Sequence, residues 1–93
     1  MTELYEKLIT KYGRGCQTTK ALEELSELIQ AICKYKSKLY SGNLNQMDAV
    51  LANVAEEMAD VEIMLEQLKI IFDNAEYVSK WKHLKQERIR GLL

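Results

Sequence analysis

Acidic residues occur as two matching pairs in this 93-residue sequence. Glu24 and Glu27 lie three positions apart in one apolar segment, and Glu57 and Asp60 have the same spacing in another. On a helix, residues three positions apart are neighbours, so each pair presents its carboxylates side by side. Glu57 falls at the edge of an apolar stripe, where an uncompensated carboxylate costs free energy. The four acids therefore predict a cation site between the two segments.

The ligand atoms of this predicted site are all oxygens, with no cysteine or histidine nearby in the sequence. Magnesium and manganese prefer oxygen ligands, and magnesium commonly binds through carboxylates together with substrate phosphates. We therefore expect a magnesium site, with manganese as a substitute, that acts on a nucleoside polyphosphate. The alternative is that these acids are solvated helix faces paired with neighbouring lysines.

The elements that position these acids are expected to be helices. The chain contains no proline and only four glycines, so long segments lack the residues that break helices. Apolar residues recur every three or four positions, which predicts helices at about residues 2–12, 18–40, 45–73 and 74–91. Gly13 to Gly15, the turn at residues 41–43 and Gly91 supply the stops.

The predicted fold class is all-α. We expect residues 1–93 to form one domain, an antiparallel bundle of about four helices whose two long central helices pack together. The apolar stripes of these helices should face the core. A second strip, at Ala59, Ile63 and Ile70, points elsewhere and is suited to an oligomer interface. A homodimer or homotetramer would thus complete the small core.

Composition excludes several classes of partner. Thirteen basic and fourteen acidic residues give a net charge near −1, which offers no general attraction for nucleic acid or anionic membranes. No apolar run reaches the ~18 residues of a membrane span, and the first residues do not resemble a signal peptide. We therefore expect a cytoplasmic protein that binds neither nucleic acid nor membrane.

Two spans, Gln17–Leu28 and Asn53–Val61, resemble the EExxE and ExxD motifs of MazG-like all-α nucleoside triphosphate pyrophosphatases. The similarity covers roughly residues 12 to 90. It implies a helical dimer or tetramer whose motif acids hold magnesium while water attacks the α–β phosphate linkage, releasing pyrophosphate and a nucleoside monophosphate. The segment between the motifs, residues 34–46, is long for the family, which puts the transfer of substrate contacts from relatives in doubt.

Carried over residue by residue, the resemblance implies that Glu24, Glu27, Glu57 and Asp60 are the metal ligands. Glu23 matches the additional acid of the first motif. Either Glu23 or Glu27 would hold or deprotonate the attacking water, and the sequence does not choose between them. Metal-assisted hydrolysis of this kind neutralises phosphate charge and activates water.

Five further residues are candidates for substrate binding. Lys20 and Lys34 lie on the carboxylate strip of their helix and are placed to reach phosphates, although surface pairing explains each equally well. Gln17 and Asn53 offer a donor and an acceptor together for a base edge or ribose, or simply cap or solvate a helix. Trp81 is a candidate for stacking on a base, but an aromatic residue at helical spacing is more often core or interface.

Together these patterns favour a magnesium-dependent nucleoside triphosphate pyrophosphohydrolase that cleaves the α–β linkage in nucleotide-pool housecleaning. Two alternatives of other classes stand beside it. One is a non-catalytic oligomeric helical interaction module whose acids only keep it soluble. The other is a metal-sensing regulator, which would keep the ion site and release no pyrophosphate.

Overall fold

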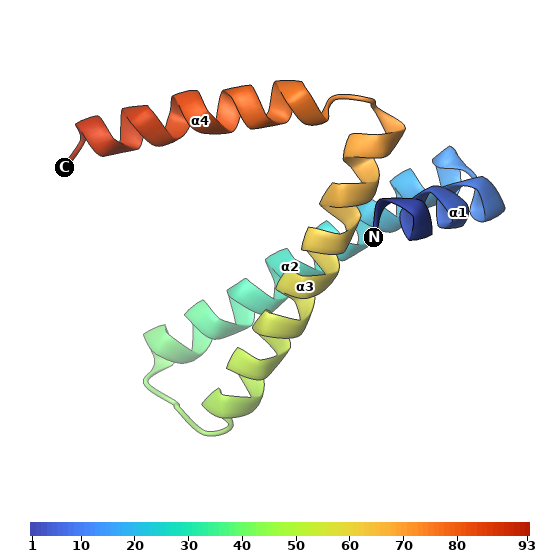
Figure 1. Cartoon of the computed structure of the whole chain (residues 1–93). Helices are drawn as coiled ribbons and strands as arrows, with labels where there is room; N and C mark the ends of the chain where they lie inside the picture. Colours follow the sequence, from blue (N-terminus) through green and yellow to red (C-terminus); the bar gives the residue numbers. More distant parts are fainter.

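The computed structural model describes residues 1–93 and consists of four α-helices without any strand. In chain order they are α1 (Thr2–Tyr12), α2 (Arg14–Ser41), α3 (Met47–Ile71) and α4 (Ala75–Gly91) (Figure 1). The predicted all-α class with four helices is confirmed. None of these helices combines the length and apolar character needed to cross a membrane.

Glycines in left-handed conformations end the first two helices. Gly13, at φ 93°, separates α1 from α2, and its N–H donates to the carbonyl of Ile9 at 2.7 Å. Gly15 remains helical, so α2 begins at Arg14 rather than near residue 18 as expected. Gly42, at φ 72°, ends α2. A single residue with positive φ suffices to end a helix.

The turn between α2 and α3 explains why α3 starts two residues later than the sequence indicated. The side-chain oxygen of Asn43 accepts the N–H of Asn45 at 3.1 Å, an Asx turn that keeps Asn45 outside the helix. Gln46 then adopts a left-handed conformation at φ 62° directly before Met47. Lys38 closes the turn by donating to the carbonyl of Asn45 at 2.7 Å.

Helices α2 and α3 form an antiparallel hairpin with a thin interface. Its buried members include Ala21 and Ala31 from α2, and Val61 and Met64 from α3. Alanines allow two helix backbones to approach closely but contribute little apolar area. Helix α1 packs across both, near the end of the hairpin opposite the turn (Figure 1).

The bulky apolar residues of the hairpin lie largely outside this interface, so the expectation that the apolar stripes face the core of the chain is wrong for many members. Exposed large side chains are Leu22, Ile29, Ile32 and Leu39 on α2, Leu51, Met58 and Leu65 on α3, and Phe72 directly after α3. The α2 face that contacts α3 instead carries smaller and polar side chains. Hydrophobicity alone selects the wrong face here, because the bulky residues are not the ones that this chain buries.

Helix α4 extends away from the rest of the protein (Figure 1). It has no buried residue and packs only against α3. The radius of gyration is 16.7 Å, whereas a compact chain of this length has roughly 12 Å. Only eight of the 93 residues are buried. One copy of the chain therefore leaves most of its large apolar side chains exposed to water.

Candidate functional site

Three carboxylates from the two helices of the hairpin meet at one point. Glu24 of α2 and Glu57 and Asp60 of α3 each offer an oxygen, and these oxygens all lie within 4.8 Å of one another. The antiparallel pairing brings them together, because the one-turn spacing of Glu57 and Asp60 puts both opposite the same turn of α2. These three acids are called the acid cluster below.

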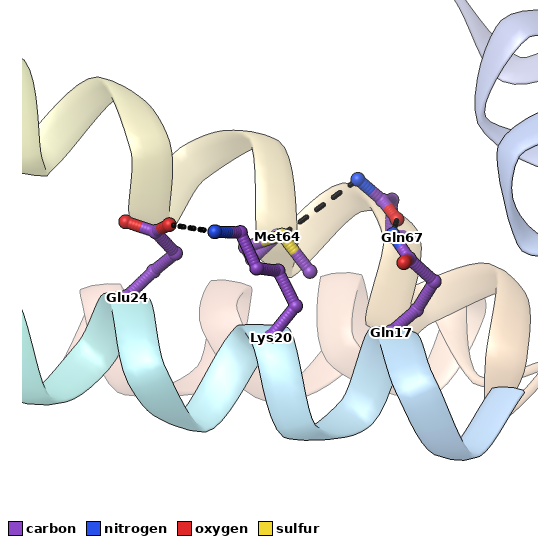
Figure 2. Close-up of polar contacts among 5 residues, drawn as sticks. All are labelled: Gln17, Lys20, Glu24, Met64 and Gln67. Atoms are coloured by element: carbon purple, nitrogen blue, oxygen red, sulfur yellow. Dashed lines mark hydrogen bonds and ion pairs between the residues drawn. The ribbon is translucent and has the colours of Figure 1, made fainter. Parts of the chain in front are cut away.

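The acid cluster is poorly compensated. Glu24 is only 7% exposed, and one of its oxygens pairs with the ammonium of Lys20 at 3.1 Å (Figure 2). The other oxygen, Oε2, and Oε2 of Glu57 are buried without any hydrogen-bond partner. Buried carboxylate oxygens normally have partners, and one lysine cannot neutralise three acids. The geometry therefore suits an additional cation.

Glu27 lies beside the acid cluster but is exposed. The charge of Glu24 raises the pKa of the Glu27 carboxyl above its ordinary value, with further contributions from desolvation and from Glu57. The pKa of Lys20 is raised in turn, mainly by its hydrogen bond with Glu24 and by the charge of that carboxylate. The charges of Glu24 and Glu57 thus act on Glu27 from both helices of the hairpin.

An open groove of about 680 Å³ begins at the acid cluster and runs between α1, α2 and α3. Its apolar wall includes Leu8 and Tyr12 of α1 and Ile63 and Met64 of α3. Its polar lining includes Gln17, Lys20, Glu23, Glu24, Asp60 and Gln67. A groove of this size with an apolar wall and a few polar groups is typical of a small-molecule site.

Two buried glutamines form the part of the groove lining remote from the acids. Gln17 of α2 donates from Nε2 to Oε1 of Gln67 of α3 at 2.7 Å, and Gln67 is only 1% exposed. Sequence reasoning proposed Gln17 and missed Gln67. Gln67 continues the strip of Asp60 and Met64 by one more helical step, and extending that strip would have found it.

The remaining predicted substrate residues are not gathered at the groove. Lys34 is exposed, two turns beyond Glu27 on α2, and Asn53 is half-buried, one turn before Glu57 on α3. Neither lines the groove. Trp81 lies on the projecting α4, is 54% exposed, and is also outside the groove of its own chain.

Comparisons of the chain with protein-family models, curated proteins and solved structures found no match. A proposal about function therefore depends on the side chains described above.

Proposed function

We propose that the chain is a magnesium-dependent nucleoside triphosphate pyrophosphohydrolase, which cleaves the α–β phosphate linkage. The observation that carries this proposal is the pair of orphaned carboxylate oxygens, Oε2 of Glu24 and Oε2 of Glu57, buried within the acid cluster. Buried acids facing one another destabilise a fold unless a ligand compensates them. The resemblance of the two acidic motifs to MazG-like enzymes is in agreement.

The residues of the acid cluster fit magnesium as a ligand set. Glu24, Glu57 and Asp60 would hold the ion, with Glu27 as the fourth ligand beside them. All of these metal ligands are carboxylate oxygens. Magnesium prefers oxygen ligands, whereas zinc has no such requirement. When bound, the ion would neutralise phosphate charge and make water a better nucleophile. Manganese would be expected to substitute.

Other side chains of the groove would act on the substrate directly. Lys20 lines the groove and forms an ion pair with Glu24 of the acid cluster. Once a cation compensates Glu24, the ammonium of Lys20 could bind a phosphate oxygen of the substrate instead. Glu23 also lines the groove and Glu27 adjoins the cluster, so one of these two carboxylates would hold the attacking water or accept its proton. Gln17 would contact the nucleoside, at the far part of the groove.

We further propose that the enzyme works as a homodimer or homotetramer. The exposed apolar side chains of α2, α3 and α4 support association, because monomeric proteins rarely leave so many large apolar groups in water. Lys34, Asn53 and Trp81 stay substrate-contact candidates in such an assembly. Trp81 would have to act from a neighbouring copy, since its own chain carries it away from the acid cluster.

One observation favours a second function, that of an interaction module. Helix α4 exposes Tyr77, Val78, Trp81 and Leu84 without any partner in its own chain. A non-catalytic module needs such a surface but has no need for buried, uncompensated acids. A metal-sensing regulator would need the acids and would release no product, so a product assay separates it from the enzyme.

The deciding experiment incubates the protein with magnesium and a panel of nucleoside triphosphates, and measures pyrophosphate, orthophosphate and monophosphate separately. We expect pyrophosphate and monophosphate in equal amounts from at least one nucleotide. Thermal unfolding in chelator and in magnesium accompanies the assay. Magnesium at a hundred times its dissociation constant should stabilise the fold by roughly 2.7 kcal/mol. Stabilisation without pyrophosphate release would support the regulator, and neither effect would support the interaction module.

A further inference from the structure

The hydrogen bond between Gln17 and Gln67 is unusual in its setting. Both side chains are almost completely buried, one on each helix of the hairpin, beside the apolar side chains of Ala21 and Met64. Two apolar residues of the same shape would serve the packing at least as well, since buried amides contribute little net stability. Stability alone does not account for the pair.

The direction of this hydrogen bond is determined by a third residue. Nε2 of Gln67 faces the sulfur of Met64 at 3.7 Å (Figure 2). A thioether sulfur accepts hydrogen bonds and cannot donate one, so the amino group of Gln67 belongs on that side. Its oxygen is thereby directed at Gln17, which must donate. The opposite orientation of both amides would leave the sulfur facing an oxygen.

Gln17 consequently keeps unused hydrogen-bonding capacity. Its Nε2 has a second hydrogen and its Oε1 accepts no hydrogen bond from the protein, while Gln17 lines the groove. An amide with a free donor and a free acceptor matches the adjacent donor and acceptor on the edge of a nucleobase. Gln17 precedes Glu24 by seven residues, about 10 Å along α2 at ~1.5 Å per residue. This separation suits a nucleotide whose phosphates lie at the acids.

We propose that Gln67 is a positioning residue, which holds the amide of Gln17 in one orientation so that it selects among nucleobases. The inference rests on the proposed function for its ligand class, a nucleoside triphosphate. Gln67 does not touch the base. It prevents the side-chain amide of Gln17 from flipping, a movement that would exchange the positions of the donor nitrogen and the acceptor oxygen. The energetic effect should therefore appear in base preference and not in phosphate binding.

The test measures binding in magnesium of α,β-methylene analogues of four nucleoside triphosphates, which resist α–β cleavage, together with inorganic tripolyphosphate. The wild-type protein should prefer one base by at least about tenfold, the discrimination expected of a two-point amide contact. Gln67→Leu, an apolar side chain that cannot accept the hydrogen bond, should bring the four affinities within about threefold. Its affinity for tripolyphosphate should equal that of the wild type.

Three further variants separate positioning from general damage to the fold. Gln67→Glu accepts the same hydrogen bond in either ionisation state, so it should retain the order of base preference even if all affinities fall together. Gln17→Met should lose the preference as Gln67→Leu does. Because both act through one contact, the double variant should lose no more than either alone. Retention of the wild-type preference by Gln67→Leu, or its loss by Gln67→Glu, would overturn the proposal.

Failure of the inference and failure of the proposed function give different results. A wild-type protein that hydrolyses nucleoside triphosphates but binds every analogue and tripolyphosphate equally would overturn the role of Gln67 alone. A wild-type protein that binds the analogues with base preference and releases no pyrophosphate would overturn the enzymatic function and support the positioning role. Absence of any analogue binding would overturn both.

Discussion

The α2–α3 hairpin and α4 depart from ordinary helix packing in opposite ways. The hairpin buries carboxylates, with Glu24 only 7% exposed, and leaves bulky apolar residues such as Leu22 and Ile29 in water. Helix α4 buries nothing and exposes Trp81 between Lys80 and Lys82. The buried acids of the hairpin lack a compensating charge, and the exposed apolar side chains lack a covering partner. Each feature indicates that something is missing from a single metal-free chain.

The difference between the two regions teaches what each lacks. The hairpin brings its acids together within one chain, so a metal ion could compensate the acid cluster without residues from a second copy. Helix α4 exposes Tyr77, Val78, Trp81 and Leu84 along its length, and the partner that we propose for this face is a second copy. Changes in the hairpin should therefore affect catalysis and ion binding, while changes in α4 should affect association.

The largest expected effect is in the hairpin. Glu57→Gln removes one charge from the acid cluster at nearly constant volume and should lower pyrophosphate release by about 100-fold or more, equivalent to about 2.7 kcal/mol of transition-state stabilisation. In chelator the same variant should be at least as stable as the wild type, because it relieves repulsion and desolvation. Activity in magnesium and unfolding in chelator are measured on the same preparations.

Glu56→Gln is the matched control, since Glu56 is the exposed neighbour of Glu57 on the same helix. It should leave activity and magnesium affinity close to the wild-type values. If Glu57→Gln were fully active, or inactive only because it had unfolded, Glu57 would not belong to the site. The proposal that the hairpin binds the metal ion while α4 mediates association would then lose its main support.

The next effect concerns α4. Trp81→Ala should weaken association by about 2 kcal/mol or more, roughly 30-fold in the dissociation constant, as expected for a central aromatic interface residue. Because Trp81 is exposed within its own chain, magnesium binding to the acid cluster should not change. Light scattering over a dilution series measures the mass, with Ser79→Ala on the same helix as control. A wild-type mass of one chain at micromolar concentration would contradict the assembly.

The smallest effect is a pH dependence of the metal-free protein. Glu24 and Glu57 raise the pKa of Glu27 above the value in the unfolded chain, so the folded state binds more protons across that interval. Stability should therefore fall as the pH rises above the ordinary pKa of a glutamate, and Glu27→Gln should flatten the slope. Urea unfolding in chelator measures it. A slope unchanged in Glu27→Gln would assign the pH dependence to other groups.

The sequence predicted the arrangement of the acidic residues better than that of the apolar residues. The spacing of Glu57 and Asp60 placed them together on one face, and the structure brings them together with Glu24. The packing of the apolar stripes was predicted less well, because Leu22 and Ile29 are apolar and yet remain exposed in the single chain. Periodicity identifies an apolar face but not the molecule that covers it.

Gln67 illustrates another limit. A glutamine in the middle of a helix has the same helical propensity whether it is exposed or buried, so neither propensity nor hydrophobicity distinguishes this one. Its role depends on pairing with Gln17, fifty positions earlier in the chain. Only the register of the hairpin makes these two residues neighbours, and that register follows from the turn at residues 42–46 together with the packing of Ala21 and Ala31.

The connection at Gly13 has a consequence for how such a protein diversifies. Helix α1 supplies Leu8 and Tyr12 to the groove, contributes no acid to the cluster, and joins α2 through this single residue. Gly13 has open space around it and a positive φ, so a side chain there would be strained by the backbone conformation and not by a clash. The wall of the groove that α1 forms is therefore structurally separate from the acid cluster. Mutations in the first twelve residues can reshape the groove without disturbing the carboxylates, so in the proposed enzyme ligand preference and metal binding can change independently of each other.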